Sequence, residues 1–185
     1  MQFIIVGIGG QGILFTSKVL GHIALTKGQK VVGSEVHGMS QRGGSVISHY
    51  KIGDYYSPLV EKGQADILLA FDQMEALRNY DFLKTGGSAV VNIHDPEHFE
   101  DESLRQFFSE KQINLYRMMG YDILKKHMKG NFLFLNVLIL GAMCGAGLGG
   151  VSLTEVKDAV SELAPSRFVE ANLKVLDLGY EALRG

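Results

Sequence analysis

Two glycine-rich segments near the start of the chain hold the residues with the clearest chemical potential. The first is Gly7-Ile8-Gly9-Gly10-Gln11-Gly12, which follows an apolar run at residues 3–6. A G-x-G-x-x-G turn between a strand and a helix can hold a phosphate against backbone N–H groups and the helix dipole. Glycine suits this turn because it tolerates positive φ and leaves room for an approaching anion. A tight strand-to-helix turn that binds nothing is the alternative.

The second segment, residues 37–45, reads His-Gly-Met-Ser-Gln-Arg-Gly-Gly-Ser and has neither a helical nor a strand period. It therefore predicts a loop. Arg42, set among glycine and polar residues, predicts an exposed guanidinium that faces a carboxylate or a phosphate. A solvated arginine on a turn is the alternative. His37 could serve as a general acid or base, or it could simply cap the end of a strand.

Glu35 lies about two dozen residues after Gly12, where a dinucleotide-binding fold places the acid that binds the ribose. One hypothesis is therefore a free-standing dinucleotide-binding oxidoreductase that uses Gly7, Gly9, Gly12 and Glu35. Dinucleotide binding does not account for the segment at residues 37–45, so this hypothesis leaves a prominent motif unexplained.

The elements that must position these loops can be predicted from the apolar pattern. Strands are expected near residues 2–6, 31–34, 45–52, 66–71 and 88–93, with a possible edge strand at 113–116. Helices are expected near residues 12–27, 72–79, 102–111, 119–128 and 132–144, after a Ser152-to-Glu155 capping box, and at the C-terminal end. This alternation predicts a single α/β domain over residues 1–185, a three-layer sandwich with a largely parallel, Rossmann-like sheet and a helical C-terminal part.

Composition excludes several classes of function. With 18 Lys and Arg against 20 Asp and Glu, the net charge is −2, which disfavours a general nucleic-acid or anionic-membrane surface. Cys144 is the single cysteine, so this chain cannot form an internal disulfide or hold a four-cysteine iron–sulfur cluster. A reduced, cytoplasmic setting is expected, and no export signal is visible.

Two further segments have a plain structural interpretation. Residues 132–151 carry no charge and are long enough to span a bilayer, but their second half is rich in glycine. A buried helix followed by a glycine cap is therefore preferred to a membrane span. The stretch His94-Asp95-Pro96-Glu97-His98 has potential metal ligands, yet Asp-Pro is also ordinary turn chemistry, and no metal site is predicted.

Together, residues 7–12 and the stretch Ser34-Glu35-Val36-His37-Gly38-Met39-Ser40-Gln41-Arg42-Gly43-Gly44-Ser45 closely resemble the gamma-type domain of 2-oxoacid:ferredoxin oxidoreductases. The likeness is greatest to the small subunit of indolepyruvate:ferredoxin oxidoreductase. It extends over essentially the whole chain, including the strand at residues 66–72 and the apolar helix that contains Asn136.

The resemblance implies a subunit and not a self-sufficient enzyme. Enzymes of this family oxidatively decarboxylate a 2-oxoacid, such as pyruvate or indolepyruvate, on thiamine diphosphate, pass electrons through iron–sulfur clusters to ferredoxin, and form an acyl-coenzyme A. Thiamine diphosphate, magnesium and the clusters are then expected on a larger partner subunit, with no cofactor held by this chain alone. The sequence agrees, because it lacks both the cysteines for a cluster and the Gly-Asp-Gly…Asn-Asn pattern of a thiamine site.

The same resemblance implies where this chain acts. Both glycine segments would lie at the interface with the thiamine-binding subunit, near the access path of substrate and coenzyme A. Arg42 and the loop N–H groups would attract a substrate carboxylate or coenzyme A phosphates, with Gln11 and Gln41 as hydrogen-bond donors. The expected site residues are Gly7, Gly9, Gly10, Gln11, Gly12, Glu35, His37, Gly38, Gln41, Arg42, Gly43, Gly44 and Ser45.

A third hypothesis is a ligand-sensing or scaffold module that kept the fold and lost the chemistry. The apolar seam of the last helix also suggests that the isolated chain could form a homodimer. The motifs do not identify which 2-oxoacid is used.

Overall fold

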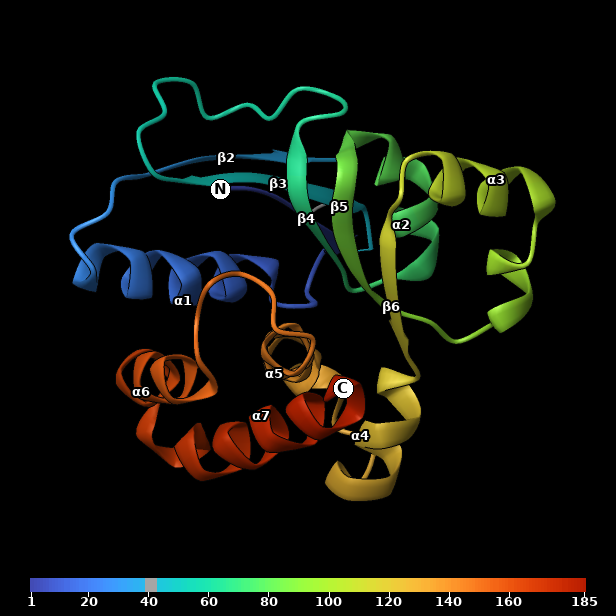
Figure 1. Ribbon diagram of the computed structural model, residues 1–185. Helices are drawn as coiled ribbons and strands as arrows, with labels where there is room; N and C mark the ends of the chain where they lie inside the picture. Colours follow the sequence, from blue (N-terminus) through green and yellow to red (C-terminus); the bar gives the residue numbers. More distant parts are fainter. Residues whose placement is uncertain (39–42) are drawn as a thin grey trace.

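The computed structural model describes residues 1–38 and 43–185, apart from the side chain of His98. In this part of the chain, six strands form one sheet in the order β2-β3-β1-β4-β5-β6 (Figure 1). The strands are β1 (Gln2–Ile8), β2 (Val31–His37), β3 (Ser45–Ile52), β4 (Ala65–Ala70), β5 (Leu83–Asn92) and β6 (Asn114–Met118). Neighbouring strands are parallel except that β3 runs antiparallel to both β1 and β2.

Helices cover both faces of this sheet (Figure 1). The helices are α1 (Ile13–Thr26), α2 (Gln73–Asn79), α3 (Glu102–Glu110), α4 (Gly120–Met128), α5 (Leu135–Gly145), α6 (Leu153–Leu163) and α7 (Val169–Leu183), with short 3₁₀ turns η1 (Tyr80–Phe82), η2 (Pro96–Phe99), η3 (Phe132–Phe134) and η4 (Ser166–Phe168). Alternate strand residues face opposite sides, as strand geometry requires. Phe3 and Ile5 pack with α1, α5, α6 and α7, whereas Ile4 and Val6 pack with α2 and α3.

The predicted α/β class and largely parallel sheet are confirmed, but the connection after α1 differs from a simple Rossmann unit. Strand β3 lies between β1 and β2, so the second strand does not neighbour the first. Strand β2 also continues to His37, so Glu35 lies within the strand and His37 is its last residue, outside the loop that follows. The cause is cross-strand pairing, because Glu35 is opposite Ser48 and His37 is opposite Val46.

Helix α5 is the centre of the larger core. Its residues from Leu135 to Cys144 are all buried, as expected for a helix that is apolar on every side. Gly141 is required where α5 meets α7, because a Cβ there would lie 2.1 Å from the carbonyl oxygen of Leu176. No helix in the described ranges is both long and apolar enough to cross a membrane.

Helix α6 begins with the predicted capping box, which also connects it to α1. Ser152 Oγ accepts from the Glu155 amide at 3.2 Å, and Glu155 Oε2 accepts from the Ser152 amide at 2.7 Å. The other carboxylate oxygen of Glu155 pairs with Lys27 Nζ at 2.7 Å. The Lys27 contact, followed by the bonds to Ser152, lowers the pKa of Glu155 to about 2.

We therefore expect Glu155→Gln to destabilise the protein in a pH-dependent way. Because the pKa of Glu155 is lowered on folding, its contribution is present above the unfolded pKa of about 4.3 and is lost as the pH falls towards 2. The substitution should lower the free energy of unfolding by at most about 1 kcal/mol near pH 7, because the ion pair with Lys27 is partly exposed. Denaturant unfolding from pH 7 to 2 tests this, with Glu181→Gln in an exposed pair as control. If the difference in unfolding free energy between the wild type and Glu155→Gln stays constant from pH 7 to 2, the lowered pKa of Glu155 does not stabilise the fold as proposed.

Candidate functional site

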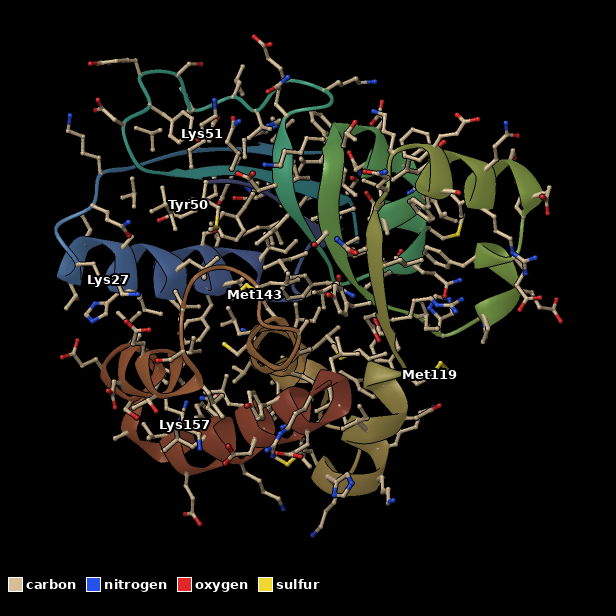
Figure 2. All side chains as sticks on the ribbon, viewed as in Figure 1. Lys27, Tyr50, Lys51, Met119, Met143 and Lys157 are labelled. Carbon is tan, nitrogen blue, oxygen red and sulfur yellow. The ribbon has the colours of Figure 1, made fainter. Side chains whose placement is uncertain are left out.

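The carboxyl ends of β1, β2, β4, β5 and β6 meet at one edge of the sheet, and the loops that follow them form the candidate site. The chain leaves β1 for α1 on one face and leaves β4 for α2 on the other. In doubly wound sheets, ligands bind in the crevice at such a reversal. Figure 2 shows Met119, directly after β6, at the start of α4 at this edge.

The first glycine segment forms a tight turn that fixes the side chain of Gln11. The backbone amide of Ile8 donates to the side-chain oxygen Oε1 of Gln11 at 2.7 Å, and the backbone amide of Gln11 donates to the Ile8 carbonyl at 3.1 Å. Gly12 adopts φ of 85° at the start of α1, and a Cβ there would lie 2.4 Å from Asn136 Nδ2. Glycine is therefore needed at position 12 both for the backbone conformation and for the close approach of α5.

The structure joins the two glycine segments. The Gly9 amide donates to the Gly44 carbonyl at 2.9 Å, although these residues belong to different loops. The Gly38 amide donates to the Ser45 carbonyl at 2.8 Å and closes the base of the β2-β3 hairpin. The described parts of both segments thus form one surface at the sheet edge.

A buried carboxylate attaches this hairpin to α2. Ser45 Oγ donates to Glu75 Oε2 at 2.5 Å, and the other Glu75 oxygen pairs with Arg78. The Glu75 side chain is only 4% exposed, so these partners offset the cost of burying its charge. Asp72, at the carboxyl end of β4, accepts from the amides of Met74 and Glu75 and caps α2 as predicted.

Glu35 and His37 lie farther from the glycine turn than the sequence pattern suggested. The acid-bearing strand of a dinucleotide fold neighbours the first strand, whereas here β3 intervenes and places β2 about 10 Å from β1. Glu35 instead lies 3.4 Å from His37 Nε2 and lines a separate hollow beside Ser17. This geometry weakens the dinucleotide hypothesis. Gln41 and Arg42 lie outside the described residues.

A pocket of about 510 Å³ opens beside the glycine turn. It is lined by Gln11, Asp72, Ile93, His94, Met119, Tyr121, Asp122, Lys125, Phe132 and Leu135. Ile93 and Leu135 are buried, whereas Asp122 and Lys125 are exposed, so an apolar interior leads to a charged mouth. Gln11 Nε2 donates to the Tyr121 hydroxyl at 3.0 Å and links the glycine turn to this pocket. The volume lies in the ordinary range for a small-molecule site.

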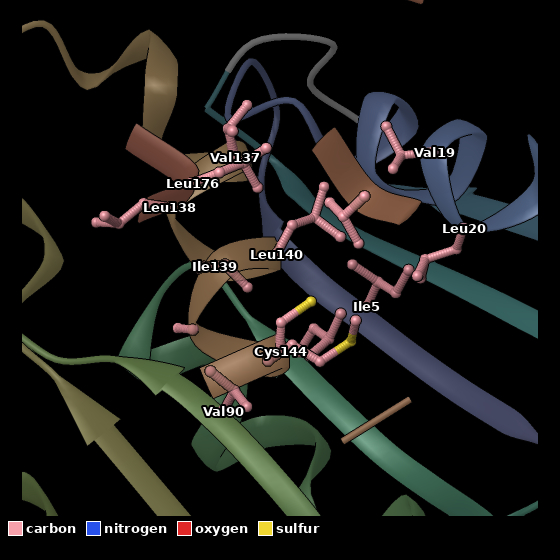
Figure 3. Close-up of a cluster of buried hydrophobic side chains, with 14 of the residues drawn as sticks. Ile5, Val19, Leu20, Val90, Val137, Leu138, Ile139, Leu140, Cys144 and Leu176 are labelled. Atoms are coloured by element: carbon pink, nitrogen blue, oxygen red, sulfur yellow. The ribbon is translucent and has the colours of Figure 1, made fainter. Parts of the chain in front are cut away.

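Metal and thiol chemistry have little support in the described residues. No group of three or more His, Cys, Asp or Glu side chains is placed there to hold a metal ion. Figure 3 shows Cys144 among apolar neighbours that include Ile5 and Leu140. Burial, with a smaller contribution from the charge of Glu155, raises the pKa of the Cys144 thiol to about 12, so it is neutral and unreactive at physiological pH.

Sequence reasoning missed Glu75 and Tyr121 as site residues and treated Asp72 only as a cap. The position of Asp72, directly after a buried strand, was a usable signal. Glu75 and Tyr121 gave none, since their partners Ser45 and Gln11 lie 30 and 110 residues away in the chain.

Residues 2–182 match the model of a protein family described as pyruvate ferredoxin/flavodoxin oxidoreductase. The chain is 36% identical to indolepyruvate oxidoreductase subunit IorB of Pyrococcus horikoshii, over 99% of this chain and 96% of that protein. It is 27% identical to the gamma subunit of a keto/oxoacid ferredoxin oxidoreductase from Geobacter sulfurreducens, with a TM-score of 0.74 over 98% and 97% of the two chains. A 2-oxoglutarate:ferredoxin oxidoreductase from Magnetococcus marinus shares the fold, with a TM-score of 0.79 at 20% identity, and this chain covers 31% of it.

We expect Ser45→Ala to loosen the hairpin from α2. The substitution removes one of the hydrogen bonds that satisfy the buried Glu75 carboxylate, which should cost about 1–2 kcal/mol of unfolding free energy. Amide hydrogen exchange near Gly44 and Val46 should also become faster. The control is Ser161→Ala, which removes a hydrogen bond on an exposed helix and should change stability by less than about 0.5 kcal/mol. Unchanged exchange in Ser45→Ala would show that the Ser45–Glu75 bond does not anchor the hairpin.

Proposed function

Because this chain belongs to the pyruvate ferredoxin/flavodoxin oxidoreductase family, we propose that it is the small, gamma-type subunit of a 2-oxoacid:ferredoxin oxidoreductase. The family expected from the two glycine motifs is confirmed by the match over residues 2–182 and by full-length similarity to IorB. That match is the observation that carries the proposal. We regard residues 1–185 as one gamma-type domain.

The proposed reaction converts a 2-oxoacid and coenzyme A into an acyl-coenzyme A and CO₂, while two electrons pass to ferredoxin. On a larger partner subunit, thiamine diphosphate with magnesium supplies the decarboxylation chemistry, and iron–sulfur clusters carry the electrons. This chain completes the active site from its side of the interface. We propose an aryl or branched 2-oxoacid such as indolepyruvate, which the name of the P. horikoshii relative supports.

Within that site, the glycine segments have a binding role. The Gly9–Gly44 bond holds the described parts of both loops at the sheet edge. In this proposal, the loop N–H groups and the guanidinium of Arg42 attract the substrate carboxylate or the phosphates of coenzyme A. Gln11 holds the glycine turn against α4 through Tyr121. His37 remains a candidate acid or base on β2, beside Glu35.

We place the complex in the cytoplasm and expect neither a nucleic-acid nor a membrane partner. When the larger subunit is absent, the isolated chain is expected to be inactive and could self-associate.

Anaerobic purification of the tagged chain from its native cell, followed by mass spectrometry, tests the subunit proposal. A larger, cysteine-rich chain that contains thiamine diphosphate should accompany it at one-to-one stoichiometry. If the chain is recovered alone from cells that express the oxidoreductase, the proposed role is wrong.

We expect Arg42→Ala to raise the apparent KM of the assembled enzyme for the 2-oxoacid or coenzyme A by about tenfold or more, since a charged hydrogen bond is lost. The value of kcat should change less, because the interaction serves binding. Arg42→Lys should recover only part of the loss, since lysine keeps the charge but lacks the guanidinium fork. Arg184→Ala, which alters an exposed pair near the C-terminus, is the control. Unchanged kinetics in Arg42→Ala would remove Arg42 from the site.

A further inference from the structure

The N-terminal ends of α5 and α7 meet at a groove that has no part in the site described above. Phe134 and Phe168, which directly precede the two helices, pack edge to face with ring centroids 6.4 Å apart. Both rings line the groove, which has a volume of about 260 Å³. Phe15 of α1 and Leu133 of η3 add further apolar walls. The groove is therefore a largely apolar hollow at the junction of three helices.

A buried amide near the start of α7 faces this groove without a partner. Asn172 is 7% exposed and lines the groove, and its side chain makes no hydrogen bond with any residue that the structure describes. Buried side-chain amides nearly always have partners, because an unmade hydrogen bond there costs free energy. The amide of Asn172 therefore indicates a partner from outside this chain.

Asn136 supplies a second amide and connects the groove to the first glycine segment. Asn136 is 8% exposed, and its Oδ1 accepts from the Val137 amide at 2.8 Å, whereas its Nδ2 has no acceptor within residues 1–38 and 43–185. A Cβ at Gly12 would lie 2.4 Å from this Nδ2, so the groove borders the glycine turn. Neither α5 nor α7 has a side-chain cap at its N-terminus, an end of the helix that favours oxygen acceptors. The groove thus offers N–H donors to a ligand that carries carbonyl groups.

Large apolar side chains at the groove are open to solvent. Leu133 is 72% exposed and Phe168 is 38% exposed, although both line the groove. The guanidinium carbon of Arg167 lies 4.8 Å from the centroid of the Phe168 ring, and no carboxylate in the described part of the chain pairs with it. Exposed apolar and aromatic side chains beside an arginine are typical of a protein–protein interface.

The size of the groove favours a peptide over a cofactor. Its volume of about 260 Å³ is smaller than the roughly 300–1,000 Å³ of most small-molecule sites. An extended peptide brings backbone carbonyls for the two amides and one large apolar side chain for the hollow. Such buried anchors supply much of the binding energy of an interface.

We propose that this groove docks an extended segment of the larger partner subunit that carries an apolar side chain beside an acidic one. Backbone carbonyls of the segment accept from Asn172 and Asn136, the apolar side chain packs between Leu133 and Phe168, and the acidic side chain pairs with Arg167. The choice of the larger subunit rests on the proposed function, because the groove borders the glycine turn that we place at that interface. The preference for a segment of this chemistry rests on the groove alone.

Leu133→Asp and Asn172→Leu are the informative variants. The first places a charge at a solvent-exposed position of the groove, so the fold should be kept. The second replaces the unpartnered amide by an apolar side chain of similar size. Because Asn172 has no hydrogen-bond partner in the described residues, the unfolding free energy of the isolated variant should equal or exceed that of the wild type. A structural role of Asn172 would instead make Asn172→Leu less stable, and denaturant unfolding distinguishes the two.

Leu59→Asp is the matched control. Leu59 is 52% exposed, and the adjacent Val60 packs in the core on the other face of the sheet from α5 and α7. The control therefore makes the same chemical change at an exposed leucine away from the groove.

Binding is measured by anaerobic biolayer interferometry between the immobilised full-length chain and the larger subunit purified with its cofactors. Leu133→Asp and Asn172→Leu should each raise the Kd by about tenfold or more, since each removes part of a buried anchor site. Leu59→Asp should bind like the wild type. In the assay of 2-oxoacid-dependent ferredoxin reduction, an excess of either groove variant should restore the wild-type maximal rate, because the groove serves docking and not the chemical steps.

The outcomes separate this inference from the proposed function. If the wild type binds and restores activity while both groove variants bind equally well, the docking groove is overturned and the subunit role stands. If Leu59→Asp weakens binding as much as Leu133→Asp, binding does not depend on the groove and the inference is again wrong. If the wild type neither binds nor adds activity, the subunit role fails and the larger subunit is not the occupant. If the groove variants instead abolish self-association of the isolated chain in light scattering, the occupant is a second copy of this chain and the proposal is overturned.

Discussion

The hydrogen bond from the Gly9 amide to the Gly44 carbonyl, at 2.9 Å, is the contact on which the site depends. It forms because β3 runs antiparallel between β1 and β2, so the hairpin turn that precedes β3 lies beside the turn that follows β1. Without that strand order, the two glycine segments would belong to separate parts of the sheet edge. The attachments at Ser45 and Gln11 then join this pair of loops to α2 and α4.

Local features of the fold could be predicted from the sequence. Asp72 and Ser152 cap helices through bonds to residues two or three positions later, and the apolar run in α5 has no polar face to expose. Sequence reasoning placed these elements because their causes lie within a few residues. The insertion of β3 and the extension of β2 to His37 were missed, because both arise from pairing between strands that propensity does not report.

In the site, too, features with a nearby cause in the sequence could be predicted, and features that depend on distant residues could not. The glycine turn was found from its spacing, and Gly12 is indeed required by its backbone conformation and by Asn136. The roles of Glu75 and Tyr121 depend on partners 30 and 110 residues away, so only the folded chain reveals them. The dinucleotide hypothesis assigned Glu35 to a ribose site because of its distance along the chain from Gly12. That distance does not indicate proximity here, because β3 lies between the two strands. The assignment of a function to this site rests on family membership, because the site does not contain a complete set of catalytic groups. The one cysteine of the chain, Cys144, is buried and lies outside it.

Reconstitution of the enzyme tests the central claim most directly. The larger subunit, purified anaerobically with its cofactors, is assayed for 2-oxoacid-dependent and coenzyme A-dependent reduction of ferredoxin, first alone and then with increasing amounts of this chain. We predict that activity is absent or very low without this chain and saturates at one equivalent. Full activity of the larger subunit alone, unchanged by the added chain, would contradict the claim that this protein completes the active site.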